Sequence, residues 1–456
     1  MILVFLTIII LSFYFLRSRV GIQNILQPNI YSILILFHLV FHVYIGTYLI
    51  ASGYSRNSVI NQISNPDLII ATFYYISLSI LLLYLGFKIS DLFFKNKSSI
   101  VFKDFLNRPI ENYNKKGENL LVFLFKILLL LCLVSAIYVT YINGEVPFVK
   151  LLFNSQAELL LSRNDFNLNF KGIKLIKNVI FEQLTPLLCL FFFALKNKNN
   201  SYKYWFYFSF LLSGYAALFS GAKSPIIVLF INLLILRYYL VGKLSSKKIL
   251  KFILVILILI LTIIILASGD SNLTLALEYL FNRVFIDEVS GTFLMFDIYP
   301  FTYDHIYFQS LSEFLSNLFG VEKIDNAQRT SMLYAFGDRA KSGLFNQLST
   351  YFLGEAWANF GFYGLIIGPI YVGFVLGFFI NFIIRLKKSF LSVSILTYFS
   401  FSSSISSQFN NFIYNSNIII ISFIILFILG YSNIIIKGYY SKEENNFFFK
   451  KNSHTK

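Results

Sequence analysis

The stretch KFILVILILILTIIILAS occupies residues 251–268, and the stretch FYGLIIGPIYVGFVLGFFINFII occupies residues 362–384. Each is apolar over the roughly 17–25 residues that a helix needs to cross a bilayer. The segment between them is polar from about Gly269 to Thr350, and it holds ten of the 22 carboxylates, from Asp270 to Asp338. These two spans predict a membrane protein in which one large polar loop separates the last helices from the earlier ones.

The rest of the chain has the composition of a multi-span membrane protein. Its 456 residues are 57% hydrophobic and only 13% charged. We predict an all-α polytopic fold with about 11 transmembrane helices, at 1–16, 28–50, 68–87, 119–142, 174–195, 204–219, 225–241, 252–268, 362–384, 389–405 and 417–436. The expected organisation is helices over 1–268, a large helical loop over 269–350, further helices over 351–436 and a basic tail over 437–456.

The net charge of +16 is explained by topology rather than by nucleic-acid binding. If the C-terminal tail lies inside, the inner segments carry 24 Lys and Arg residues and the outer segments carry 12. This asymmetry follows the positive-inside rule. It predicts a bacterial inner membrane protein with its N-terminus and large loop outside and its C-terminus in the cytoplasm.

No metal or cofactor is expected. Cys132 and Cys189 both fall inside spans, so neither a disulfide framework nor a zinc site is indicated. His38 and His42 share a face of the second span, but no carboxylate or Cys completes a metal site around them. The chain also lacks the motifs of soluble hydrolases, nucleotide triphosphatases and zinc proteases.

A short turn, Gly221-Ala222-Lys223-Ser224-Pro225, precedes the seventh span. Ser224 is placed to cap that helix, and Pro225 suits its first position. Free N–H groups, a hydroxyl and the Lys223 ammonium would converge there, as the binding of a phosphate requires. The alternative is an ordinary capped helix whose lysine extends to lipid headgroups.

Several outer cations could clamp a diphosphate. Arg283 lies in an apolar helical stretch, where a guanidinium can bind phosphate oxygens in a bidentate manner. Its alternative is an i, i+4 pair with Asp287 on a solvated face. The other outer cations are Arg163, Arg329, Arg339 and Lys341, each of which could equally be a surface charge.

Candidate general bases lie in and after the large loop. Glu355 and Asn359 stand four residues apart, on one helix face, where the chain re-enters the membrane. Glu288, Asp338 and His305 are the other candidates, and the residue pattern does not choose among the four. Glu182 lies at membrane depth in the fifth span, where pairing with Lys177 or Lys174 is a sufficient structural account.

The chain resembles the O-antigen polymerase family of oligosaccharide repeat-unit polymerases. In topology the resemblance extends over most of the chain. Four local features carry it: Ser162-Arg163-Asn164-Asp165, Ser220-Gly221-Ala222-Lys223-Ser224, the helix with Arg283, and Gly354-Glu355 followed by Asn359-Phe360-Gly361-Phe362-Tyr363-Gly364. Lys223 stands where family members often have Arg, which keeps the charge and loses the bidentate fork.

The resemblance implies a metal-independent glycosyltransferase similar to the lipid-dependent C superfamily. Such enzymes polymerise undecaprenyl-diphosphate-linked repeat units of O-antigen or capsular polysaccharide, in lipopolysaccharide or polysaccharide biosynthesis, at the outer face of the inner membrane. Its partners would be lipid-linked glycans, membrane lipid and a candidate chain-length regulator protein, with no nucleic acid. Diphosphate binding would fall to Lys223, Ser224, Arg283, Arg163 and Arg339, and catalysis to Arg283 with Glu355, Asp338, Glu288 or His305.

Two other functions are compatible with this sequence. An O-antigen ligase would use the same donor and a similar large loop, and it would usually depend on a loop histidine such as His305. A flippase or transporter of lipid-linked oligosaccharide would place its charges in a central cavity. The charges at membrane depth are few, namely Glu182, Lys126 and Arg237, and the last two lie near inner helix ends.

Overall fold

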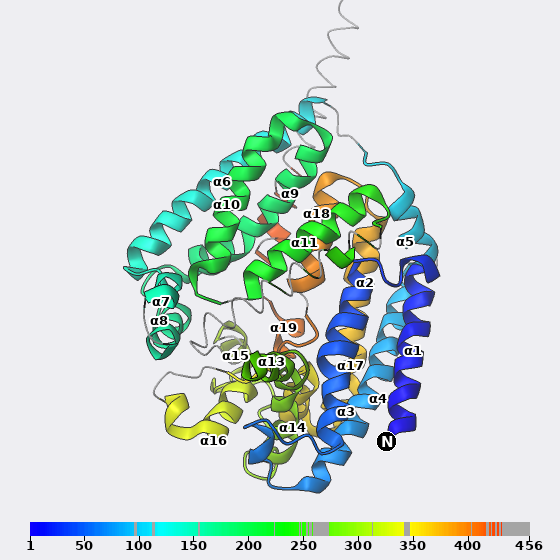
Figure 1. Cartoon of the computed structure of the whole chain (residues 1–456), viewed down its shortest axis with the longest axis vertical. Helices are drawn as coiled ribbons and strands as arrows, with labels where there is room; N and C mark the ends of the chain where they lie inside the picture. Colours follow the sequence, from blue (N-terminus) through cyan, green and yellow to red (C-terminus); the bar gives the residue numbers. More distant parts are fainter. Residues whose placement is uncertain are drawn as a thin grey trace, which may run out of the picture.

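The computed structural model describes residues 1–94, 98–111, 115–153, 156–222, 224–245, 247, 249–251, 254, 258, 273–311, 313–341, 347–402, 404–415, 419–420, 422–424, 426–427 and 430. Every regular element within these residues is a helix (Figure 1). The structure therefore confirms the all-α class predicted from the sequence, as far as the chain is described.

Within the described residues, seven helical stretches are long and apolar enough to cross a membrane: Ile2–Val20, Ile30–Ala51, Pro66–Asp91, Lys116–Asn143, Ile176–Lys198, Ser224–Val241 and Phe352–Arg385. They support a polytopic membrane protein. The predicted spans at 204–219 and 389–405 form shorter helices, α10 (Lys203–Phe219) and α18 (Phe390–Ser402). The predicted spans at 252–268 and 417–436 and the tail at 437–456 lie largely or wholly outside the described residues.

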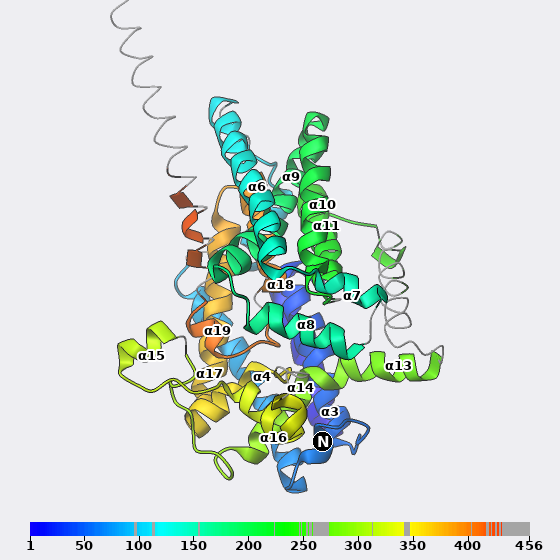
Figure 2. The same ribbon diagram turned by 90° about the vertical axis from the view of Figure 1, so that its left-hand side faces the viewer.

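The spanning helices form two groups (Figures 1 and 2). One contains α1 (Ile2–Val20), α2 (Ile30–Ser32), the π-helix η2 (Ile33–Tyr44), α3 (Ile45–Ala51), α4 (Pro66–Asp91), α5 (Ser98–Asn107) and α17 (Phe352–Arg385). The other contains α6 (Lys115–Asn143), the π-helix η4 (Ile176–Leu184), α9 (Thr185–Lys198), α10 and α11 (Ser224–Val241), with α18 packed on α9 and α11.

Glycines bring α4 and α17 into close contact. A Cβ atom on Gly86 of α4 would overlap the carbonyl oxygen of Ile370, and one on Gly373 of α17 would overlap that of Leu83. Gly377 contacts the Ser90 side chain in the same way. Small residues at these positions let the two helix backbones approach closely.

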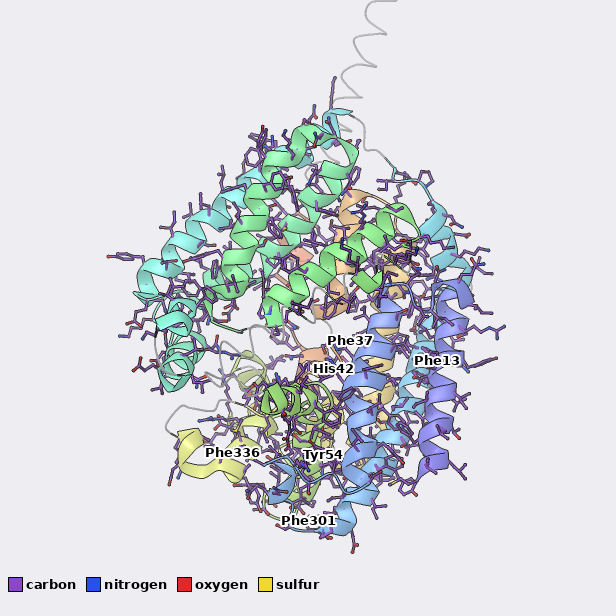
Figure 3. All side chains as sticks on the ribbon, viewed as in Figure 1. Phe13, Phe37, His42, Tyr54, Phe301 and Phe336 are labelled. Carbon is purple, nitrogen blue, oxygen red and sulfur yellow. The ribbon has the colours of Figure 1, made fainter. Side chains whose placement is uncertain are left out.

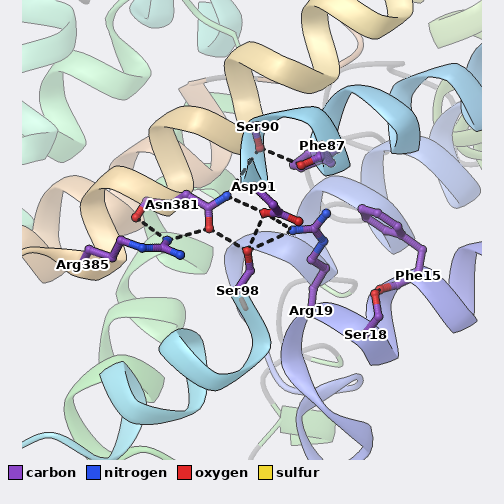
Figure 4. Close-up of polar contacts among 9 residues, drawn as sticks. All are labelled: Phe15, Ser18, Arg19, Phe87, Ser90, Asp91, Ser98, Asn381 and Arg385. Carbon is purple, nitrogen blue, oxygen red and sulfur yellow. Dashed lines mark hydrogen bonds and ion pairs between the residues drawn. The ribbon is translucent and has the colours of Figure 1, made fainter. Parts of the chain in front are cut away.

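A polar cluster joins four helices at the end of α17 farthest from the large loop (Figure 4). Arg19 of α1 donates to Asp91 Oδ1 of α4 at 2.7 Å, and Ser98 of α5 donates to the same oxygen at 2.6 Å. Asn381 of α17 donates to it at 2.9 Å and accepts a 2.8 Å hydrogen bond from Arg385. The Arg19 side chain is only 4% exposed, so the cluster supplies the polar partners that a buried guanidinium needs.

The large loop is helical, as its sequence pattern predicts. It contains α13 (Leu273–Phe281), the π-helix η6 (Asn282–Ile286), α14 (Asp287–Ile298), α15 (Glu313–Phe319) and α16 (Ala327–Lys341). The α14 helix is buried and packs on α3, α4 and the start of α17. The loop is therefore fixed to the span bundle through α14, at the lower end of the molecule in Figure 1.

Two short helices, α7 (Pro147–Phe153) and α8 (Gln156–Leu168), follow α6 and lie across its lower end in Figure 1. Both lie between the fourth and fifth predicted spans. Lys177 of η4 donates to the Phe166 carbonyl at 2.8 Å, and the Phe166 ring lies 4.8 Å from that of Phe219 at the end of α10. These contacts hold α8 against the second helix group.

Candidate functional site

Arg283 lies in η6, a single π-helical segment between α13 and α14. Tyr54 donates from its hydroxyl to Asn282 Oδ1 at 3.0 Å, and Asn57 donates to Asp287 Oδ1 at 2.9 Å. These two bonds, one on each side of Arg283, attach the segment to the chain that follows α3. Short π-helical stretches often occur at functional sites, because they change the direction of side chains in an otherwise regular helix.

The carboxylates nearest to Arg283 pair with it only loosely. Its guanidinium lies 3.8 Å from Asp287 Oδ2 and 3.5 Å from Glu288 Oε1, and half of its side chain is exposed. The Asp287 contact is the i, i+4 pair that the sequence offered as a purely structural role. Contacts of this length and exposure contribute little to stability, so Arg283 keeps donors for a ligand.

Arg163 of α8 is the second cation at this site. The charge of Arg283 reaches it, and burial together with that repulsion lowers the pKa of the Arg163 guanidinium. Among the residues that the structure describes, no carboxylate lies within ion-pair distance of Arg163. Two neighbouring guanidinium groups repel each other, and an anion between them would remove that repulsion.

Glu288 does not cancel this positive charge completely. Burial raises the pKa of its carboxyl group, while Arg283 acts in the opposite direction and Asp287 adds to the rise. The charged form of Glu288 is thus disfavoured by the site that surrounds it. Glu288 lies 3.5 Å from Arg283, and its raised pKa makes it easier to protonate than an ordinary carboxyl group, as the role of a base requires.

The turn that the sequence assigned to phosphate lies beside α8. Gly221 has a φ of +69°, and a Cβ atom there would come within 2.7 Å of Leu159 Cδ1. Leu159 is one helical turn before Arg163, so the two share a face of α8. Ser224 is the exposed first residue of α11, whereas Lys223 lies outside the described residues.

The remaining outer cations belong to α16 or lie away from these contacts. Arg329 donates to the Ala340 carbonyl at 3.2 Å, which holds α16 together around its bend. Lys341 lies 3.8 Å from Asp338, and both side chains are well exposed. Arg339 is on the same helix, and its side chain lies outside the described part of the structure. The described contacts of Asp338 therefore connect it with Lys341 rather than with Arg283.

Glu355 is fully buried near the start of α17. Its carboxylate accepts hydrogen bonds from the backbone N–H of Asn410 at 3.0 Å and from the Asn410 amide at 3.1 Å. Asn410 also donates to Ser310 of the large loop at 2.9 Å. Glu355 thus holds α19 (Asn410–Ile413) and the loop against α17, and it would have to become accessible before it could act as a base.

His305 supports a bend in α17. Gly361 has a φ of +55°, and the bend leaves the carbonyls of Ala358 and Asn359 to accept from the N–H groups of Ile306 (2.9 Å) and Tyr307 (3.0 Å). The His305 Nδ1 atom lies 3.3 Å from the same Ala358 carbonyl, and a Cβ on Gly361 would press on its ring. The described contacts of His305 are those of a packing residue.

Glu182 and Lys177 act on each other electrostatically, as the sequence suggested, but the hydrogen bonds of Lys177 go elsewhere. Lys177 donates to the carbonyls of Phe166 and Asn167, at 2.8 and 3.3 Å, and its ammonium lies over the Phe166 ring. Within the described residues no ion pair forms between Lys177 and Glu182. A sequence pattern detects possible ion pairs through spacing, but it does not reveal the carbonyl groups that compete for the lysine.

His42 is a neighbour of Arg283 that the sequence did not identify. The charge of Arg283 acts on its imidazole, and η2 packs directly against η6. The only available sequence signal was that His42 and His38 share a helix face. Nothing in the sequence connects that face with a loop arginine.

The described residues contain no group of three His, Cys, Asp or Glu side chains that could hold a metal ion. No family model, curated protein or solved structure matches this chain.

Proposed function

We propose that this protein is an integral membrane glycosyltransferase that polymerises undecaprenyl-diphosphate-linked oligosaccharide repeat units. The observation that carries the proposal is that the charge of Arg283 acts on Arg163, which comes from a different element. Asp287 and Glu288 pair with Arg283 only loosely, and no described carboxylate forms an ion pair with Arg163. Such a pair suits a ligand with two adjacent negative groups, as in a diphosphate.

The chemistry would be a direct transfer. A hydroxyl oxygen of the acceptor forms a bond to the anomeric carbon of the donor, while the bond from that carbon to the diphosphate oxygen breaks. The departing undecaprenyl diphosphate takes the electron pair, and the hydroxyl proton passes to a base. Because negative charge develops on the diphosphate, fixed cations beside it would supply much of the catalysis. Lys223 and Ser224 would add donors, and Glu288 is the candidate base with the described position nearest to Arg283.

A groove on the second helix group supports a lipid-linked substrate. It measures about 600 Å³ and runs between α6 and α10 with an almost wholly apolar lining that includes Leu133, Ile137, Phe208, Leu211 and Tyr215. Tyr215 and Thr140 lie near the ends of α10 and α6 beside α7 and α8. A prenyl chain in this groove would bring its diphosphate to the end of the bundle that carries Arg163.

The topology remains part of the proposal. In it, the large loop, Arg163 and Arg283 face the outside of the bacterial inner membrane, because the basic turns lie at the opposite ends of the helices. The substrate would then be presented on the outer leaflet after translocation. Reaction of the native lysines with a membrane-impermeant amine reagent, in intact spheroplasts, would leave the Lys-rich inner turns unlabelled.

The test is deletion of the gene followed by size separation of surface glycan and lipid-linked intermediates. The proposal expects single repeat units to persist on surface lipid while longer chains disappear, and Arg283→Ala and Lys223→Ala to reproduce that result. Accumulation of long chains on undecaprenyl diphosphate would identify a ligase. Intermediates retained on the inner leaflet would identify a transporter, and the enzyme assignment would then be wrong.

A further inference from the structure

The two histidines of the π-helix η2 have different environments. His38 is buried, and its Nδ1 atom lies 3.2 Å from Ser404 Oγ. His42 is half-buried, and its ring centre lies 5.8 Å from that of His38. The His38 imidazole therefore has a partner inside the protein, whereas the His42 imidazole is partly exposed.

The ring of His42 is oriented but not hydrogen-bonded. The Phe37 ring lies 4.2 Å from it and covers one side, and Figure 3 shows both side chains where η2 faces the loop helices. Within the described residues, neither ring nitrogen of His42 has a hydrogen-bond partner. An imidazole always carries at least one N–H donor, and here that donor is available to a ligand.

His42 and Arg283 lie on elements that face each other: the Phe41 ring, next to His42, is 5.8 Å from the Phe285 ring of η6, and Gly46, one turn after His42, contacts the Phe285 backbone. Arg283 of η6 acts electrostatically on both His42 of η2 and Arg163 of α8, and η2 and η6 are in direct contact. The three side chains come from three separate elements, and Arg283 is the one that interacts with both of the others.

We propose that His42 is a ligand-binding residue that donates a hydrogen bond to the diphosphate held by Arg163 and Arg283. This inference rests on the proposed function of the site. The Phe37 ring limits rotation of the imidazole, so the bond has a preferred direction and adds specificity to the site. Phosphate oxygens accept such a bond without any change in covalent structure.

Histidine NMR gives a direct test, because the chain has only four histidines, His38, His42, His305 and His454. The full-length protein in detergent micelles, labelled with 15N and 13C in its histidines, would be titrated with inorganic pyrophosphate. We expect the His42 resonance, assigned from its loss in His42→Gln, to shift saturably with the same midpoint as binding. A His42 resonance that stays in place while pyrophosphate saturates the protein overturns the inference.

Affinity measurements separate this inference from the function on which it rests. His42→Gln should weaken pyrophosphate binding by about tenfold or more, since a lost hydrogen bond to a charged group has effects of that size. Unchanged affinity in His42→Gln, together with a loss in Arg283→Ala, rejects His42 alone. Unchanged affinity in Arg283→Ala rejects the anion site and the proposed function with it.

A second titration identifies the source of the diphosphate. Farnesyl diphosphate in the same micelles should bind more tightly than pyrophosphate if the natural ligand is a lipid carrier. Equal affinity would assign the site to a soluble diphosphate and would contradict the lipid-linked donor. The His42 shift is expected with either ligand, because both present the same phosphate oxygens.

Discussion

Replacing Gly46 with alanine should move Arg283 without touching it. Gly46 is the second residue of α3, and a Cβ atom there would overlap the backbone carbonyl of Phe285, two residues after Arg283. The same Cβ would come within 3.1 Å of Val289 Cγ1. A carbonyl in the backbone of η6 has no alternative rotamer, so α3 and η6 must separate, by a distance on the order of 1 Å.

The expected cost follows from three effects. Overpacking at a close contact costs about 1–3 kcal/mol. The separation also strains the 3.0 Å hydrogen bond between Tyr54 and Asn282, which contributes roughly 0.5–1.5 kcal/mol. Alanine recovers up to about 1 kcal/mol through its higher helix propensity. Gly46→Ala should therefore destabilise the protein by about 1–3 kcal/mol.

Thermal unfolding in detergent and pyrophosphate binding together measure the effect. Gly214→Ala on α10 is the matched control, because no atom lies within 4 Å of the added Cβ and the propensity gain is the same. The control should unfold at the same temperature or higher and bind normally, whereas Gly46→Ala should unfold earlier and bind more weakly. Equal stability and affinity in the two variants would show that α3 does not position Arg283.

Three further predictions concern charges. Arg163→Met removes the repulsion between the two guanidinium groups and one donor to the anion, so it should raise thermal stability and weaken pyrophosphate binding by about tenfold. Lower stability with unchanged binding would show that Arg163 has a structural role instead. Glu288→Gln removes a 3.5 Å contact that competes for Arg283, so affinity should rise by about 1.5- to 5-fold. Burial raises the pKa of Glu288. As the pH falls through that pKa, the affinity of the wild type for pyrophosphate should rise more than the affinity of the Glu288→Gln variant. Equal changes in the two proteins would contradict this. Burial lowers the pKa of Lys388 to about 8, and the nearby charge of Arg108 acts in the same direction, so the stability of the protein should decrease as the pH falls from 10.5 towards 8. The Lys388→Met variant should lose that dependence. Thermal unfolding at several pH values would measure both proteins.

The sequence predicted the elements of this fold better than their contacts. Apolar runs located the long helices, because that signal depends on residues near each other in the chain. The packing of α4 against α17 did not follow. Gly373 and Gly377 can accommodate any helix that presents a small residue such as Gly86 at the right height.

The candidate site shows the same limit. Arg283 and Arg163 could be selected one at a time, as cations in outer segments, but their interaction depends on where the fold places α8 and η6. Glu355 was selected as a candidate base from its position near a helix start. Its burial by Asn410 depends on a segment 55 residues away that folds back onto α17.

The arrangement of the two arginines also explains why the site can keep its charge. Repelling side chains normally move apart, but here each backbone is held by contacts that do not involve the other arginine. Lys177 and Phe219 fix α8 through Phe166, while Tyr54 and Asn57 fix η6.

The cost of holding two cations together is therefore met by contacts elsewhere in the fold, and the site is preorganised before an anion arrives. Preorganised charge needs little rearrangement during a reaction, which is the condition under which it stabilises a leaving diphosphate most effectively. A variant that loosens α8, such as Lys177→Met, should then weaken anion binding although Lys177 does not contact the anion. Isothermal titration with pyrophosphate would measure this, and an affinity equal to wild type would mean that α8 is held without Lys177.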